Sequence, residues 1–346
     1  MPELKAIPSR LYRSFGPALV GAVAFAFATT ALADPVWDKV GEAFGKAGTE
    51  MPGGVYRIAL PRTDIKATLD GVELKPGFAL GGWLAFQKMG DTAMVMGDLV
   101  LTQDEVNPVM AKLLAGGIEV TALHNHLLRN TPFTMYMHVY GRGDPVKLAT
   151  ALHAGLAESK TPMTAAAPSA APPPTDLDTA ALDQILGAKG TNNGGVYGYG
   201  IRRADPINDG GMTVPASMGS AIGINFQPTG GGKAAITGDF VLLGSELQPV
   251  IKALRDNGIE VTAIHNHMVD EQPRLFFVHF WANDDAKKLA QGLRAALAHH
   301  AAGRAKDRGR VPPPPAALSP SRDRQAPSYR ISAPRHAGLS APGSFR

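Results

Sequence analysis

Hydrophobic and polar positions follow one order of strand-like and helix-like spacing, and the chain runs through this order twice. Alternation of period two indicates strands, whereas apolar residues three or four positions apart indicate helices. In the first half we expect helices at 37–46, 102–114 and 144–158, and strands at 55–60, 67–74, 80–87, 93–101, 118–128 and 134–140. This order predicts an α+β fold of two tandem repeats, each a mostly antiparallel sheet with helices on one face.

The second half repeats these elements with one expected departure. The corresponding segments are 180–186, 196–201, 234–242, 245–255, 259–269, 275–281 and 285–299. The run Asn208-Asp209-Gly210-Gly211 favours a turn, and we expect it to replace the strand predicted at 67–74.

The central helix of each repeat carries a start signal. Thr102 with Glu105, and Ser245 with Gln248, have the spacing of a capping box, in which two side chains satisfy free backbone N–H groups. These pairs predict where the two helices begin.

The internal repeat is visible in the residues themselves. Gly-Ile-Glu-Val-Thr-Ala-Leu-His-Asn-His at 117–126 recurs at 258–267 with one change, Leu to Ile. A duplication of this extent indicates two copies of one domain. We expect the two copies to pack together as a pseudo-dimer. The expected divisions are a signal peptide at 1–33, repeat one at 34–158, an Ala/Pro-rich linker at 159–175, repeat two at 176–300 and a disordered basic, Pro-rich tail at 301–346.

The first 33 residues have the order of a secretory signal. Lys5, Arg10 and Arg13 precede an apolar run, and Ala31-Leu32-Ala33 offers small residues to a signal peptidase. We predict cleavage after Ala33, a periplasmic or secreted protein, and no transmembrane span after cleavage.

Composition excludes several classes of function. The chain has no cysteine, which excludes disulfides, thiolate metal sites and a cysteine nucleophile. The formal net charge is +4, but basic residues are concentrated in the signal and the tail, so residues 34–300 are acidic. An acidic folded region argues against nucleic acid as a partner.

Three histidines recur at equivalent positions of the two repeats, in a His-x-His plus His arrangement. In a strand, residues i and i+2 share a face, and the strand that follows each His-x-His is expected to place its histidine directly opposite. Three histidines with an open position commonly hold a catalytic zinc, and imidazole also suits other divalent transition metals. The sequence therefore predicts one metal site in each repeat, formed by His124, His126 and His138, and by His265, His267 and His279.

Two other interpretations of these histidines remain open. Ile118, Val120 and Ala122 have the same parity as His124, so the imidazoles could form a buried structural network within an apolar stripe. Neighbouring aromatic residues could instead form a cleft for a ligand without metal. Asp98 and Asp239 are candidate further ligands or carboxylates that orient an imidazole, or alternatively residues that end a bulge.

Long motifs around the histidines resemble a known family. They are Gly-Asp-Leu-Val-Leu-Thr at 97–102, Glu-Val-Asn-Pro-Val-Met at 105–110, the His-Asn-His segment, and Arg-Leu-Phe-Phe-Val-His-Phe-Trp-Ala-Asn-Asp-Asp at 274–285. Over residues 34–298 the chain resembles the LppY/LpqO family of bacterial envelope proteins. The resemblance implies an envelope location, two copies and a shared His-Asn-His signature, and it implies no activity. Lipoproteins of that family carry a lipid-bearing cysteine that this chain lacks.

These observations favour an envelope protein that binds a metal or an unidentified small-molecule or cell-envelope ligand. A metal-dependent hydrolase acting on envelope substrates and a non-catalytic structural or interaction module are the alternatives. Whether the protein is an enzyme is left open by the sequence, and no catalytic residue is assigned.

Overall fold

The computed structural model describes residues 34–164 and 174–300. The predicted signal peptide, the tail and residues 165–173 of the predicted linker lie outside the described residues.

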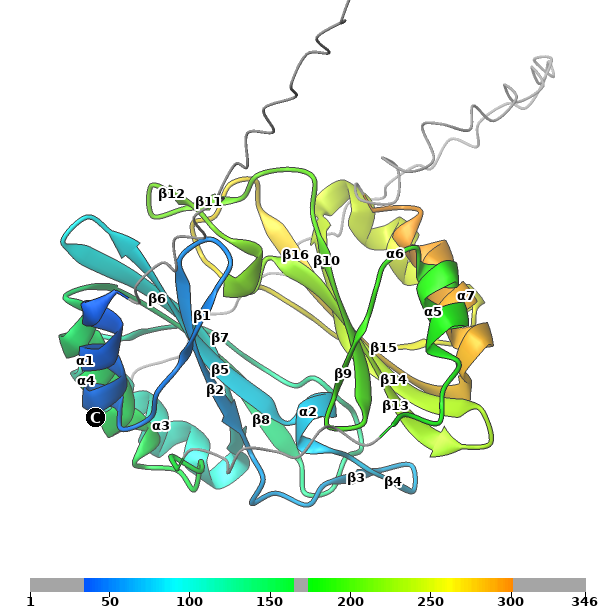
Figure 1. The fold of residues 1–346 in the computed structure, drawn as a ribbon, viewed down its shortest axis with the longest axis horizontal. Coiled ribbons are helices and arrows are strands. Elements are labelled where there is room, and N and C mark those ends of the chain that lie inside the picture. Colours follow the sequence, from blue (N-terminus) through cyan, green and yellow to red (C-terminus); the bar gives the residue numbers. More distant parts are fainter. Residues whose placement is uncertain (1–33, 165–173, 301–346) are drawn as a thin grey trace, which may run out of the picture. The chain divides into compact units, whose positions relative to one another are not determined.

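The first repeat forms a six-stranded antiparallel sheet with the strand order β1-β2-β5-β6-β8-β7 (Figure 1). Its strands are β1 (Thr49–Met51), β2 (Val55–Pro61), β5 (Gly81–Met89), β6 (Thr92–Thr102), β7 (Glu119–His124) and β8 (Thr134–Gly143). A two-residue hairpin joins β3 (Thr68–Leu69) to β4 (Val72–Glu73). The helices are α1 (Pro35–Phe44), α2 (Pro76–Ala79), α3 (Gln103–Ala115) and α4 (Pro145–Leu156).

The second repeat forms an equivalent antiparallel sheet with the order β15-β16-β14-β13-β10-β9. Its strands are β9 (Thr191–Asn193), β10 (Val196–Arg202), β13 (Ala221–Gly230), β14 (Lys233–Leu243), β15 (Glu260–His265) and β16 (Leu275–Asp285). The helices are α5 (Thr179–Leu186), the 3-10 helix η1 (Ala216–Met218), α6 (Gly244–Asp256) and α7 (Ala286–Leu297). The α+β class and the duplicated antiparallel sheet predicted from the sequence are confirmed.

Each sheet buries its two faces differently. In the first repeat, alternate residues such as Ile58, Phe86 and Val139 pack beneath α1, α3 and α4, as the placement of these helices in Figure 1 shows. Residues of opposite parity, among them Met94 and Met96, join a core with residues of the second repeat. The sheets therefore contact each other through the faces that carry no helices. Within the described residues, no helix is long and apolar enough to cross a membrane.

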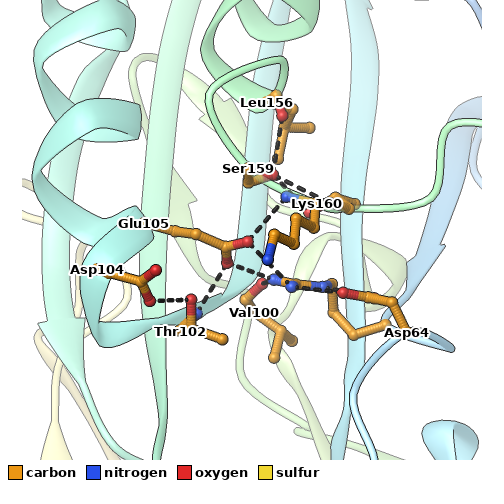
Figure 2. A network of polar contacts seen from close by, with 10 residues as sticks. Asp64, Val100, Thr102, Asp104, Glu105, Leu156, Ser159 and Lys160 are labelled. Atoms are coloured by element: carbon orange, nitrogen blue, oxygen red, sulfur yellow. Dashed lines mark hydrogen bonds and ion pairs between the residues drawn. The ribbon is translucent and has the colours of Figure 1, made fainter.

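A buried ion pair joins the end of β2 to α3 in the first repeat (Figure 2). Nη1 of Arg62 donates to the Glu105 carboxylate at 2.7 Å and to the Val100 carbonyl at 2.7 Å. Glu105 also accepts from the backbone N–H of Thr102 at 2.9 Å, as the predicted cap requires, and from that of Lys160 at 2.8 Å. Burial of such a pair is favourable only because each polar atom has a partner.

The strand predicted at 67–74 and the expected start of the second central helix are wrong. Residues 68–73 form the β3–β4 hairpin and no single strand. The run at 208–211 enters a turn as predicted, but within the equivalent hairpin between β11 (Asn208–Asp209) and β12 (Met212–Thr213), so the two repeats do not differ here. The predicted capping pair Ser245 and Gln248 lies inside α6. The helix begins at Gly244 with Leu243 as its N-cap, and Glu246 accepts from the backbone N–H of Leu243 at 2.8 Å.

Candidate metal centre

The six histidines of the two predicted sites lie together between the sheets. The ring of His124 stacks on that of His265 with 3.6 Å between centroids. Two further pairs cross the interface: His126 with His279, and His138 with His267, each with centroids 3.8 Å apart. The contacts occur in equivalent pairs, as a twofold relation between the repeats requires.

A β-bulge turns the histidines toward this interface. The pairing of β7 with β8 shifts its register between Val120 and Ala122, so Thr121 is the additional residue. Val120 lies opposite Val139 on the helix-covered face, whereas Ala122 lies opposite His138 on the other face. The same shift occurs between Val261 and Ala263 in β15.

The bulge contradicts two details predicted from the sequence. Because parity changes at Thr121, the apolar stripe that includes Ile118 and Val120 packs beneath the helices and does not surround the histidines. In addition, His124 lies opposite Tyr136, and His138 lies opposite Ala122. The strands pair antiparallel as predicted, but the register differs by two residues from the expected one.

The bulge residues also bond the two repeats to each other. The hydroxyl of Thr121 donates to the carbonyl of His267 at 2.6 Å, and the amide of Asn266 donates to the carbonyl of Thr121 at 3.0 Å. The equivalent bonds run from Thr262 to the carbonyl of His126 and from Asn125 to the carbonyl of Thr262. The asparagine of each His-Asn-His motif thus fixes the loop that carries its own histidines against the other repeat.

Backbone carbonyls fix the tautomers of two histidines. Nδ1 of His138 lies 3.1 Å from the Gly97 oxygen, and Nδ1 of His279 lies 2.8 Å from the Gly238 oxygen. A carbonyl oxygen can only accept, so each Nδ1 carries the proton and each Nε2 presents a lone pair. A hydrogen bond of this kind from the distal nitrogen is typical of histidines that bind metals.

Many polar atoms of the cluster lack a hydrogen-bond partner within the part of the chain that the structure describes. They are Nδ1 and Nε2 of His124 and His265, Nε2 of His126, His138 and His279, and Oδ1 of Asp98 and Asp239. Buried polar groups are ordinarily satisfied, and each one left without a partner costs about 1–3 kcal/mol. So many in one place indicate a site shaped for a ligand.

Two sets of three imidazoles have the spacing to hold an ion. One set is His124, His265 and His279, and the other is His138, His265 and His267. In each set the candidate ligand atoms lie within 4.8 Å of one another. Each set draws on both repeats and uses His265, which differs from the separate site per repeat predicted from the sequence.

Asp98 and Asp239 lie beside the histidines. Oδ2 of Asp98 is 3.4 Å from Nε2 of His126, and Oδ2 of Asp239 is 3.1 Å from Nε2 of His267. In the sheet, Asp98 pairs with His138 and Asp239 with His279. These positions fit aspartates that bind a metal or orient an imidazole, and not residues whose role is to end a bulge.

Burial favours the neutral form of several imidazoles in the cluster. It lowers the pKa of His124 to about 2, with the neighbouring His279 and His267 acting in the same direction. The pKa values of His126 and His138 are also far below the ordinary value because of burial and the adjacent imidazoles. Burial raises the pKa of Asp98, and Asp239 raises it further. Neutral imidazoles are the form that binds a metal ion.

A pocket of about 290 Å³ opens beside the cluster, between the two sheets. His126, His267, His279 and both aspartates line one part of it. Arg57, Trp83 and a series of small residues, including Gly223, line the remainder. The histidines are therefore reached from a cavity large enough for a small organic molecule.

The sequence interpretation missed Arg57 and Trp83. The second repeat has Gly198 and Gly223 at the positions equivalent to Arg57 and Trp83. A search for residues that both repeats share cannot find such positions, whereas a search for differences between the repeats could have found them. Arg129, three residues after His126, forms exposed ion pairs with Asp70 and Glu260.

Comparisons with known proteins give a family and no activity. The family described as Domain of Unknown Function (DUF1259) matches residues 38–158 and again residues 180–299. No curated protein matches the chain.

Solved structures show only a low likeness to the chain. The trimeric bacterial microcompartment shell protein PduB is 12% identical, with a TM-score of 0.19 over 75% of this chain and 91% of that one. EtuB from Clostridium kluyveri is 10% identical, with a TM-score of 0.19 over 76% and 92%. EutL from Leptotrichia buccalis C-1013-b is 8% identical, with a TM-score of 0.18 over 71% and 97%. TM-scores of this size support no statement about the fold or function of this chain.

Proposed function

This chain belongs to the family Domain of Unknown Function (DUF1259), and from its histidine cluster we propose that it binds a divalent transition metal ion between its two repeats. The observation that carries the proposal is the set of buried imidazole nitrogens without hydrogen-bond partners among the described residues. A purely structural network would satisfy these atoms, because an unsatisfied buried polar group opposes folding.

The donor set defines the class of ion. Neutral imidazole suits zinc, copper, iron and nickel, whereas calcium and magnesium prefer oxygen ligands. His138 and His279 are already oriented by the Gly97 and Gly238 carbonyls, with Nε2 available. His265 belongs to both sets of three and is the residue on which binding depends most. Zinc is the first ion to test.

The location that we propose is the cell envelope. Residues 1–33 have the composition of a cleavable secretory signal, with cleavage after Ala33 and a periplasmic or secreted mature chain. The resemblance of the His-Asn-His segments to the LppY/LpqO family supports the same location.

Metal-dependent hydrolysis is a second candidate, and one observation favours it. Asp98 and Asp239 line the pocket together with three histidines, so carboxylates stand where a small molecule would enter. A divalent ion in such surroundings supplies activation of a bound water. Burial and Asp239 raise the pKa of Asp98, which suits a group that takes part in proton transfer.

Metal content tests the proposal directly. The full chain, purified without a histidine tag and reconstituted with zinc at neutral pH, should retain at least one ion per chain after gel filtration. His265→Ala should lose this ion. His153→Ala is the matched control, since His153 is an exposed histidine of α4 outside the cluster. Substoichiometric zinc, copper and nickel in the wild-type chain would overturn the proposal and leave a structural network.

A further inference from the structure

The pocket beside the histidines is built from different residues in the two repeats. Opposite Asp98 in the first sheet is Trp83, whereas opposite Asp239 in the second sheet is Gly223. Arg57 of β2 corresponds to Gly198 of β10. The histidines and aspartates are duplicated, but a cation and an indole occur on one side only.

Gly223 of the second repeat leaves space in the pocket because it has no side chain. A Cβ added to Gly223 would have no described atom within 4 Å, whereas Trp83 fills the equivalent position with a large ring. The Trp83 ring lies near Gly219 and thus close to His267. The pocket is therefore a single asymmetric cavity, with one wall of small residues and one wall formed by Arg57 and Trp83.

Arg57 is a partly buried cation without a close counter-ion. Its guanidinium carbon lies 4.1 Å above the centre of the Trp83 ring, and its Nη1 donates to the Ser217 carbonyl. Among the described residues no carboxylate forms an ion pair with it, and Asp98 acts on it only through its charge at longer range. A guanidinium has five N–H donors, so several remain for a ligand. Buried charges in proteins are ordinarily paired.

Metal binding would leave the site short of negative charge. Asp98 and Asp239 would neutralise a divalent ion, and the charge of Arg57 would remain. One further negative charge in the pocket would therefore be needed to neutralise the Arg57 guanidinium. An oxyanion satisfies both the charge and the forked donor geometry of arginine.

We propose that the pocket binds one small organic oxyanion, a carboxylate or a phosphate monoester, with its charged group on Arg57 over the Trp83 ring. The rest of the ligand points along the small-residue wall toward His126 and His279. The assignment rests on the proposed metal function only for the end of the ligand that points toward His126 and His279. The contact with Arg57 does not depend on the metal.

Calorimetry with simple anions tests the assignment on the full chain. Inorganic phosphate and acetate are titrated separately into the zinc-loaded and the zinc-free protein, with tryptophan fluorescence recorded in parallel. We expect saturable binding of at least one of the two anions and a fluorescence change from Trp83. Arg57→Gln should weaken the binding at least tenfold without changing the zinc content.

Two variants separate the pocket from general charge effects. Arg142→Gln is the matched control, because Arg142 is also an arginine whose Nη1 donates to a single carbonyl, that of Gly210, but it does not line the pocket. It should bind anions like the wild type. Gly223→Val keeps Arg57 and reduces the pocket, so it should weaken an anion that extends toward the histidines, such as phenyl phosphate, more than it weakens phosphate.

The outcomes distinguish this proposal from the metal proposal. If zinc does not bind but phosphate or acetate binds in an Arg57-dependent way, the metal function fails and the anion site stands. Equal affinities for the wild type and Arg57→Gln, or no saturable binding of either anion in either form of the protein, would overturn the anion site.

Discussion

The imidazole of His124 lies face to face with that of His265, the residue at the same place in the second repeat, with ring centroids 3.6 Å apart and planes inclined by 14°. Two equivalent residues can stack in this way only where the repeats meet. The cluster therefore belongs to the interface, and neither repeat contains it alone. Changes at the interface should alter both stability and metal binding.

Removing one hydroxyl at the bulge should weaken the interface. Thr121→Val leaves the carbonyl of His267 without its donor, which should lower the free energy of unfolding by about 1–3 kcal/mol. Urea denaturation measures this change. Thr150→Val is the control, because the hydroxyl of Thr150 is exposed and bonds within its own helix, so its effect should stay within about 0.5 kcal/mol. Equal midpoints for the two variants would contradict the assigned role of Thr121.

The buried ion pair of the first repeat should contribute strongly to stability. Glu105→Gln leaves Arg62, which is 1% exposed, with the less buried Asp64 as its remaining ion-pair partner, and should reduce the free energy of unfolding by about 3 kcal/mol. Asp256→Asn removes an exposed pair with Lys252 and should change it by less than about 0.5 kcal/mol. Denaturant titration of both variants checks the contrast, and similar losses would refute it.

Acid should destabilise the protein through the same pair. Burial raises the pKa of Glu105, but hydrogen bonds from Arg62 and from the Thr102 and Lys160 backbones more than offset this, so its folded pKa lies below the ordinary 4.5. The stability that it contributes is complete above the unfolded pKa and is lost as the pH falls through the folded pKa. Wild-type protein should lose stability below about pH 4.5 more steeply than Glu105→Gln does. Parallel curves of unfolding free energy between pH 5 and 3 would count against this assignment.

Two neighbouring glycines should respond in opposite ways to alanine. A Cβ at Gly238 would overlap the carbonyl of Gly223 on the adjacent strand, so Gly238→Ala should be destabilised by more than about 2 kcal/mol or fail to fold. Gly223→Ala meets no described atom within 4 Å and should cost little. Thermal unfolding of the two variants checks this contrast, and a tolerated Gly238→Ala would show that β13 and β14 can move apart here at little cost.

The sequence was sufficient for most of the helices and long strands, the duplication and the antiparallel pairing of the His-Asn-His strand, but it missed β13 and gave one strand in place of the β3–β4 hairpin. It was insufficient for the register, because Thr121 looks like an ordinary strand residue and a bulge reverses which residues share a face. It was also insufficient for the joint site. Spacing along one strand predicts which histidines of a repeat lie together, but carries no information on what the second repeat places against them.

The difference between Trp83 and Gly223 has an evolutionary consequence. In a homodimer of single repeats, each position at the interface would be occupied by the same residue on both sides, so a bulky ring that fills one half of the cavity would fill the other half as well. Fusion of the two copies into one chain removes this constraint. One half can then keep an open wall while the other acquires a cation and an indole, which no symmetric assembly of identical subunits can achieve.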